Sequence, residues 1–345
     1  MIVVMAKLEF PYELFLLVTL NLGLILALIR LAPALGLIDR PGGRKTHSFP
    51  TPVIGGFVIY LTLLMAIALQ QDWGSEVAKI TIWAGLIIVI SIFDDIKDIP
   101  WYLRICVQML AVSGVMVSTD IHVNSLGIYP IVGHLELGSF GYVFTGFAII
   151  CMTNAINLID GIDGLCASII LVPVSFLLAL IYFSGGGINF YLLIFFISIL
   201  IFLVFNLSSH HKLKIFLGDA GSTTLGFILS LIIISTAQNE TLSLSPPIGL
   251  WLFFIPIADT CFVIIMRIQN RKSIFQPTKT HIHHLLMLKG YSDRSTLVIM
   301  LMISILSASV GLFLNTKTDI ISLLAFLGVL LLAFIYFRHT QNCLS

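Results

Sequence analysis

The chain has 345 residues, of which 58% are hydrophobic and only 10% charged, and its mean hydropathy is +1.07. A soluble domain carries about 25% charged residues, so the composition excludes an ordinary soluble domain and predicts an all-α polytopic integral membrane protein. The formal net charge of +1 indicates no strongly acidic or basic partner, and no nucleic acid is expected. The five cysteines form no CxxC pair, so we expect small apolar side chains rather than a disulfide framework or a zinc site.

Apolar runs of the length needed to cross a bilayer, about 17–25 residues, recur along the chain. The first run, from about Tyr12 to Leu31, is followed by no small-residue cleavage site, so we expect a retained helix and not a removed signal peptide. In all, about eleven spans are predicted. They lie at roughly 12–32, 52–70, 79–93, 104–119, 140–158, 166–183, 189–206, 221–237, 247–266, 296–313 and 319–337.

The basic residues predict the orientation of these spans. If the loops alternate across the membrane, nearly all of the 18 Lys and Arg residues fall on the side opposite the N-terminus. Excess Lys and Arg marks the cytoplasmic side, so the N-terminus is expected outside and the C-terminus inside. We expect one transmembrane domain over 1–345, with an active site built from cytoplasmic loops. These loops lie at about 33–51, 94–104, 157–166, 207–221 and 267–295.

Two polar motifs lie in the first cytoplasmic loops. The stretch "DRPGGRKTHSFPTPVIGG", residues 39–56, includes Lys45 and His47, and such a loop can bring backbone N–H groups and cations to a phosphate. Its alternative interpretation is a basic loop with turn residues. In "FDDIKDIPWYLR", residues 93–104, the adjacent carboxylates of Asp94 and Asp95 repel each other unless a cation or proton intervenes. They can bind a divalent cation, or one can act as a base; a solvated helix end is the alternative.

The third motif, "NAINLIDGIDGL" at residues 154–165, spaces four polar residues by threes. If the segment is helical, these side chains share one face, because residues i and i+3 are neighbours on a helix. Asn157, Asp160 and Asp163 supply the oxygen ligands that suit Mg²⁺. Gly161 and Gly164 allow a close approach to the backbone. Capping of the next helix is the alternative, which explains one aspartate but not four polar residues in register.

The remaining motifs follow in chain order. Asp219, in "FLGDAGST" at 216–223, lies between two glycines just before a predicted helix, where free N–H groups form an anion site. An ordinary helix cap is the alternative. The cluster "THIHHLL", residues 280–286, holds three histidines that can bind phosphate or uridine-like groups or orient a carboxylate; zinc is not favoured. A solvated histidine cluster is the alternative. Asp259, in "PIADT" near Pro256, is either a functional intramembrane acid or an acid that makes a hydrogen bond between packed helices.

These clusters share one predicted face, near the membrane boundary. Carboxylates, Mg²⁺ and cations together are typical of phosphoryl transfer, which favours an enzyme acting on a lipid phosphate. A proton- or cation-coupled transporter, the second class considered, is expected to place its charges near the bilayer midplane between inverted repeats. No evident repeat is present, and a purely structural protein explains none of the motifs.

Jointly, "RKTH", "PTP", "GG", "DD", "NAINLIDGIDGL", "LGDAGS" and "HIHH" resemble the polyprenyl-phosphate N-acetylhexosamine-1-phosphate transferases, over residues 39 to about 295. The resemblance implies that GlcNAc-1-phosphate passes from UDP-GlcNAc to undecaprenyl phosphate, with Mg²⁺ or, as the alternative, Mn²⁺. The "HIHH" form resembles the UDP-GlcNAc branch more than the branch that transfers phospho-MurNAc-pentapeptide, which has consecutive histidines and is kept as the alternative. A homodimer in the bacterial inner membrane, with its site facing the cytoplasm, is implied. The reaction would begin a cell-surface polysaccharide such as an O-antigen or common antigen.

The same resemblance implies roles for individual residues. Asn157 and Asp219 correspond to the metal ligands, and Arg104 to a cation for the diphosphate. Asp163 would hydrogen-bond uridine, with Asp160 supporting the site beside it. Either Asp94 or Asp95 would deprotonate or orient the lipid phosphate, although that phosphate is already largely ionised near pH 7. The residues assigned to substrate binding also include Lys45, His47, His281, His283 and His284.

Overall fold

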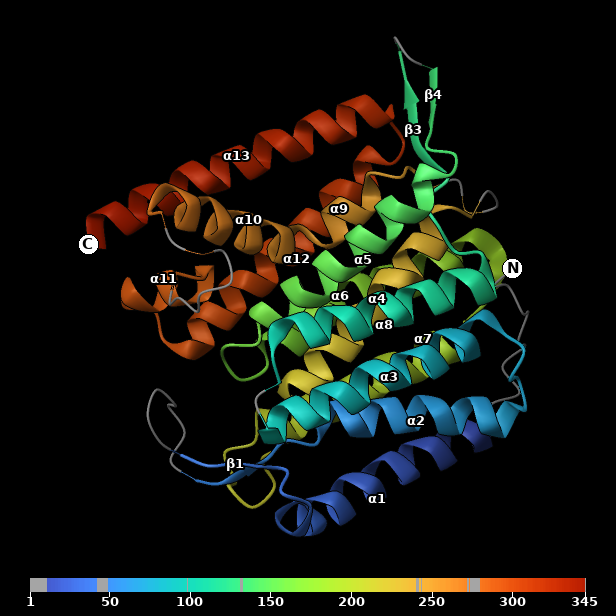
Figure 1. Cartoon of the computed structure of the whole chain (residues 1–345), viewed down its shortest axis with the longest axis vertical. Helices are drawn as coiled ribbons and strands as arrows, with labels where there is room; N and C mark the ends of the chain where they lie inside the picture. Colours follow the sequence, from blue (N-terminus) through green and yellow to red (C-terminus); the bar gives the residue numbers. More distant parts are fainter. Residues whose placement is uncertain are drawn as a thin grey trace. The chain divides into compact units, whose positions relative to one another are not determined.

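The computed structural model describes residues 11–41, 49–97, 99–130, 133–239, 242, 244–271, 273 and 280–344 (Figure 1). This part of the chain is mainly helical, with two short antiparallel two-stranded sheets, which confirms the predicted all-α class. The chain divides into two compact units. Unit 1 comprises Met1–Ile121 and Val174–Leu231, and unit 2 comprises His122–Pro173 and Ile232–Ser345.

Unit 1 is built from helices that pack side by side, both on sequence neighbours and on the distant helix α7. Helix α2 packs against α1, α3 and α7, and α3 packs along α4. Inside the unit, the buried Asn21 amide donates a hydrogen bond to the Thr62 hydroxyl at 2.8 Å, which satisfies a donor that lipid cannot. The elements are α1 (Pro11–Leu35), β1 (Ile38–Asp39), β2 (Thr51–Pro52), α2 (Gly55–Gln70), α3 (Glu76–Lys97), α4 (Trp101–Thr119) and α7 (Phe190–Asn206).

Unit 2 packs around α10, which contacts α5, α12 and α13 (Figure 1). The short helix α11 lies against α12 and α13, and an apolar cluster that includes Trp251, Phe262 and Met300 fills the space between them. The elements are β3 (Ser125–Tyr129), β4 (Gly133–Glu136), α5 (Phe140–Leu158), α9 (Ile248–Leu252), α10 (Phe254–Gln269), α11 (Ile282–Leu288), α12 (Asp293–Leu314) and α13 (Asp319–Leu344). Two further helices, α6 (Leu165–Ile181) and α8 (Gly218–Ala237), contain two of the three points where the chain passes between units; the first lies after Ile121.

Each of the predicted spans coincides with a helical segment. Among the described residues, eight helices are long and apolar enough to cross a membrane, and Gly55–Gln70 and Phe190–Asn206 are shorter apolar helices. The run 247–266 is not one helix, because α9 ends at Leu252 and α10 begins at Phe254. Pro256 explains the break, since it has no N–H to donate to the carbonyl of Leu252 four residues earlier. The number of spans and their orientation stay predictions.

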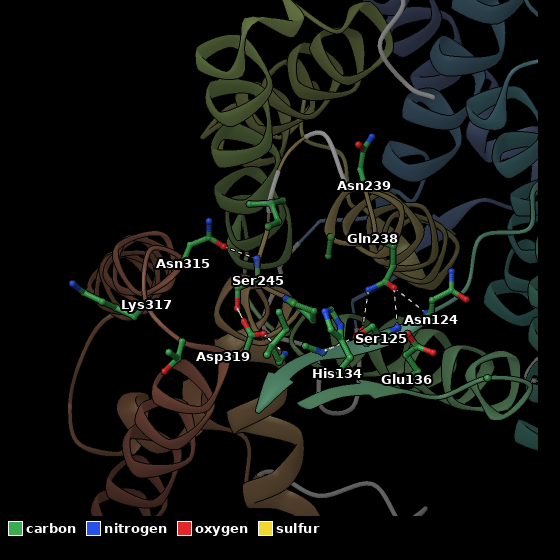
Figure 2. A pocket seen from close by; sticks show the side chains of 17 residues that line it. Asn124, Ser125, His134, Glu136, Gln238, Asn239, Ser245, Asn315, Lys317 and Asp319 are labelled. Carbon is green, nitrogen blue, oxygen red and sulfur yellow. Dashed lines mark hydrogen bonds between the residues drawn. The ribbon is translucent and has the colours of Figure 1, made fainter. Parts of the chain in front are cut away.

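A pocket of about 840 Å³ lies in unit 2, beside the hairpin β3–β4 and the end of α12 (Figure 2). Figure 2 shows Gln238 directed at Asn124 and Ser125, whose backbone N–H groups donate to its Oε1 at 2.9 and 3.2 Å. Asp319 accepts hydrogen bonds from the Ser245 hydroxyl and from the backbone N–H of Ile128. These polar groups therefore bond to one another and tie the hairpin to the helix ends.

Candidate active site

Three carboxylates and one guanidinium gather in unit 1, and we call this group the carboxylate cluster (Asp94, Asp95, Asp219 and Arg104). Nη1 of Arg104 lies 2.6 Å from Oδ2 of Asp94 and 3.6 Å from Oδ2 of Asp219. The side chain of Asp94 is only 9% exposed, whereas that of Asp219 is 48% exposed. Arg104 therefore joins a nearly buried acid to one that faces solvent.

Local structure explains how these side chains meet. Asp94 and Asp95 lie in the last turn of α3, as the sequence predicted. Oδ1 of Asp94 accepts a hydrogen bond of 2.7 Å from the backbone N–H of Ile99, which orders the turn into α4. Arg104 follows in the first turn of α4, where its long side chain reaches back to α3.

The third element of the cluster is the beginning of α8. Asp219 lies in the first turn of this helix and not before it, which corrects the sequence-based boundary. Oδ2 of Asp95 accepts a hydrogen bond of 3.4 Å from the N–H of Ala220, at the positive end of the helix dipole. One turn deeper, the hydroxyls of Ser91 and Thr223 lie 3.0 Å apart and link α3 to α8.

Close backbone approach holds the loop before α2 against the loop before α8. The N–H groups of Gly55 and Gly56 donate to the carbonyls of Phe216 and Leu217 at 2.9 and 3.3 Å. A Cβ at Gly56 would lie 1.9 Å from the Cα of Gly221, so only glycine allows this contact. The "GG" and "GDAG" stretches therefore bring two backbones together beside the carboxylate cluster.

The histidines form a second group, in unit 2, which we call the histidine cluster (His281, His283 and His284). His283 and His284 lie in α11 rather than in a loop, and His281 is the residue directly before this helix. The ring centroids of His283 and His284 are 4.2 Å apart, and those of His281 and His283 are 5.8 Å apart with nearly parallel planes. The three imidazoles therefore form one group, in which the rings of His281 and His283 are stacked and that of His284 is tilted.

Asp259 supports this cluster from α10. Its carboxylate is fully buried, with Oδ2 lying 2.6 Å from Nδ1 of His281 and Oδ1 accepting a 2.6 Å hydrogen bond from the N–H of Ile282. The pairing spans more than 20 residues, so local spacing in the sequence gave no sign of it. The intramembrane position of the acid was the only signal.

His283 is 1% exposed, and neither of its ring nitrogens has a hydrogen-bond partner among the described residues. Burial, reinforced by the neighbouring His284 and His281, lowers the pKa of His283 to about 3. The ring packs against Gly161, where a Cβ would lie 2.2 Å from Nε2. The "IDG" turn and the histidine cluster are therefore in direct contact, although more than 100 residues separate them.

The stretch 154–165 is not a continuous helix, so the expectation of a single polar face is wrong. Helix α5 ends at Leu158 with Asn157 in its last turn, whereas Asp160 and Asp163 lie in the following turn and are exposed. Between them, Ile159 is fully buried and anchors the turn. Gly164 has a φ of +77°, a conformation that favours glycine and ends the turn before α6.

Not all predicted site residues can be placed. Lys45 and His47 lie outside the described residues. Asn157 belongs to unit 2 and Asp219 to unit 1, and each is described within its own unit. Among the described residues, no three His, Cys, Asp or Glu side chains converge closely enough to form a metal site by themselves. The cluster in unit 1 nevertheless offers only carboxylate oxygens, the donor type that Mg²⁺ prefers.

The fold and the polar clusters define a multi-pass α-helical membrane protein with acidic and histidine-rich groups at helix ends. Residues 77–237 match the model of glycosyl transferase family 4. The chain is 31% identical over 284 residues to undecaprenyl-phosphate alpha-N-acetylglucosaminyl 1-phosphate transferase of Escherichia coli (strain K12), covering 82% of this chain and 77% of the relative.

Two further relatives extend the match. The protein of the same name from Yersinia pestis is 30% identical over 312 residues, 90% of this chain and 85% of its own. A Bacillus subtilis (strain 168) protein named "Probable undecaprenyl-phosphate N-acetylglucosaminyl 1-phosphate transferase" is 32% identical over 298 residues, 85% and 82% of the two chains. The chain belongs to glycosyl transferase family 4, the family of these membrane-bound sugar-phosphate transferases.

Proposed function

We propose that this protein transfers GlcNAc-1-phosphate from UDP-GlcNAc to undecaprenyl phosphate, producing undecaprenyl-diphospho-GlcNAc and UMP. The printed names of three relatives describe this transfer, and the carboxylate cluster lies within residues 77–237, which match the family model. The product would begin a cell-surface polysaccharide such as an O-antigen or common antigen.

In the proposed reaction, an oxygen of the lipid phosphate attacks the β-phosphorus of UDP-GlcNAc. The bond between this phosphorus and the oxygen that bridges to the α-phosphate breaks, and UMP leaves with the electron pair. One phosphoanhydride replaces another, so the equilibrium is close to balanced. The nucleophile is already largely ionised near pH 7, so orientation and charge compensation matter more than proton removal.

The observation that carries the proposal is the position of Arg104 between two acids. A guanidinium 2.6 Å from Asp94 and 3.6 Å from Asp219 is held in place before any substrate arrives. Its remaining N–H groups suit a phosphate, which arginine recognises in a planar, bidentate geometry. We assign Arg104 to the diphosphate of UDP-GlcNAc, and Asp94 or Asp95 to orienting the lipid phosphate.

A divalent cation, Mg²⁺ or alternatively Mn²⁺, is part of the proposal. Asn157 and Asp219 are the residues that would hold it, and Asp219 is half exposed at the start of α8, where a ligand can approach. When bound, the cation would neutralise charge on the diphosphate. Arg104 already neutralises part of the negative charge of the carboxylate cluster, so the guanidinium and the cation would compete for the same carboxylates.

The second group of residues is assigned to the nucleotide and the sugar. Asp163 is exposed in the turn after α5 and is proposed to hydrogen-bond uridine, with Asp160 supporting that turn. His281 and His284 are proposed to contact the sugar-diphosphate. His283, being buried against Gly161, would support the turn from beneath.

The setting is also a proposal. Most basic residues lie in loops on the side that the charge rule assigns to the cytoplasm, which supports an inner-membrane protein with a site facing the cytoplasm. UDP-GlcNAc would then arrive from the cytoplasm and undecaprenyl phosphate from the bilayer. A homodimer is proposed from the family resemblance.

The experiment is UMP release by the purified protein in detergent, with undecaprenyl phosphate and Mg²⁺. UDP-GlcNAc and UDP-MurNAc-pentapeptide are supplied in separate reactions, and the Asp219→Asn variant is the control. We expect lipid-dependent UMP from UDP-GlcNAc alone, lost in the variant and with EDTA. Release only from the pentapeptide substrate would assign the chain to that branch, and no release by folded protein would refute the proposal.

A further inference from the structure

Asp259 is the most completely buried acid in the described part of unit 2, and neither substrate nor metal has been assigned to it. It lies in the middle of α10 with 0% exposure. A lone carboxylate in such surroundings is strongly unfavourable unless it is paired and hydrogen-bonded. Both of its oxygens are in fact used, at 2.6 Å each, and both partners belong to the segment that carries the histidine cluster.

The two hydrogen bonds fix different things. The bond from the N–H of Ile282 satisfies one of the free donors at the start of α11, so it holds the backbone. The bond to Nδ1 of His281 fixes a side chain, because a carboxylate accepts and the proton must therefore be on Nδ1. Among the described residues no hydrogen bond to Nε2 is recorded, so with 8% of the side chain exposed this nitrogen is the atom left to meet a ligand.

A carboxylate behind an imidazole also favours the protonated ring. The titratable and charged groups around His281 are Asp259 and Arg267 from α10, and His283 and His284 from its own segment. Helices α12 and α13 pack on α11 through apolar side chains such as Met300 and Phe337. Of these groups, Asp259 is the one whose negative charge favours a positive ring.

We propose that Asp259 is a positioning residue that acts through His281. It holds the ring with Nδ1 protonated and favours the imidazolium, so that Nε2 also carries a proton and donates a hydrogen bond to the phosphate groups of the nucleotide-sugar. This inference rests on the proposed function, since it names the group that prepares one histidine for an anionic ligand. Nothing in it requires Asp259 to touch the substrate.

The alternative is that Asp259 only anchors α11 to α10. The Asp259→Asn variant separates the two, because an amide of the same size still accepts from the Ile282 N–H but cannot favour the imidazolium. Asp259→Glu keeps the charge and is the rescue variant. The matched control is Thr260→Val, which removes the next polar group of α10, a buried hydroxyl with no hydrogen-bond partner among the described residues.

Two readouts are measured on the full-length protein in detergent. The first is kcat and KM for UDP-GlcNAc in UMP release between pH 5.5 and 9, alongside thermal unfolding. The second is the titration midpoint of His281, followed by ¹⁵N NMR of labelled histidine and assigned by the signal lost in His281→Gln. The second readout needs neither catalysis nor substrate.

For Asp259→Asn we expect kcat to fall about 10- to 100-fold, by analogy with the range seen for groups that orient a metal-ligating histidine. The fall of activity at alkaline pH should move to lower pH, the His281 midpoint should move the same way, and Asp259→Glu should restore part of both. In the His281→Gln background the same change should cost little more, because the two residues act as a unit.

Wild-type kcat and an unchanged alkaline limb in Asp259→Asn would overturn the inference. So would a loss of activity that only follows the loss of folded protein while the His281 midpoint stays in place. A wild-type protein that releases no UMP refutes the proposed function instead, and the midpoint then decides alone whether Asp259 controls the charge of His281.

Discussion

The ring of His283 packs directly on the backbone of Gly161, so close that a Cβ at residue 161 would lie 2.2 Å from Nε2 and 2.6 Å from Cε1. This contact ties the turn that presents Asp160 and Asp163 to the helix that presents the histidine cluster. The absence of a side chain at residue 161 is therefore a requirement of the site and not a loop preference.

Gly161→Ala tests that contact. Because His283 is 1% exposed, its ring has little room to withdraw, so the added methyl should displace the turn. A displacement of about 1 Å at a site can lower turnover about 100-fold, and we expect a decrease of about 10- to 100-fold in UMP release. Gly23→Ala in α1 is the control, since nothing lies within 4 Å of a Cβ there. Equal turnover in both variants would show that the contact is unimportant.

Arg104→Lys tests whether the guanidinium that bridges Asp94 and Asp219 in the carboxylate cluster is required. A lysine keeps the charge but loses the planar fork that serves Asp94, Asp219 and a phosphate together. We expect kcat/KM for UDP-GlcNAc to fall about 100-fold, similar to the removal of one donor that stabilises developing charge. Lys97→Ala, which removes a charge from the end of α3, should leave kcat/KM within about threefold. A small effect of Arg104→Lys, comparable to that control, would argue against the bridge.

His283 makes stability depend on pH. In the folded protein its pKa is lowered to about 3 by burial, whereas an unfolded chain binds the proton near pH 6.5. The unfolded state therefore takes up a proton that the folded state refuses, and stability falls as pH drops below about 6.5. The slope from one such group is at most about 1.4 kcal/mol per pH unit.

Thermal unfolding at pH 7.5, 6.5 and 5.5 measures this effect. The decrease in melting temperature toward pH 5.5 should be smaller in His283→Gln than in the wild type. His134→Gln, which removes an exposed imidazole from β4, should keep the wild-type dependence. Parallel curves for all three proteins would contradict the assignment.

Asp319 should stabilise the end of unit 2 without affecting catalysis. Its two oxygens accept hydrogen bonds from Ile128 and Ser245, so Asp319→Asn should lower the free energy of unfolding by about 1–3 kcal/mol. Hydrogen exchange in β3 should become faster, while UMP release stays near the wild-type rate. Glu136→Gln, a neutralised acid in the same pocket, is the control. A loss of turnover with unchanged exchange would reveal a catalytic role for this pocket.

Hydropathy alone predicted the positions of the helices, because lipid requires long apolar runs with internally satisfied backbones. The failures come where backbone chemistry interrupts a run. Pro256 splits one expected span after Leu252, and the polar stretch after Asn157 leaves the helix in a turn that ends at Gly164. Each interruption had a local signal in the sequence: a proline in the first case and a glycine in the second. A search for apolar runs or for a three-residue periodicity does not detect these residues.

In the candidate site, too, some features could be predicted from the sequence and others could not. Sequence motifs identified the acids and histidines themselves, and the structure gathers Asp94, Asp219 and Arg104 in one cluster. Contacts such as Gly56 on Gly221, or Asp259 on His281, could not be predicted, since they depend on how distant helices pack and not on local spacing.

The most direct test of the account follows the phosphate itself. UDP-GlcNAc labelled with ³²P in its β-phosphate is incubated with the purified protein, undecaprenyl phosphate and Mg²⁺, and the label is traced. Transfer of the sugar with its phosphate predicts that the label enters the lipid and that the UMP is unlabelled. Label that stays in a released nucleotide, as UDP, would show that the sugar moves without its phosphate and would contradict the account.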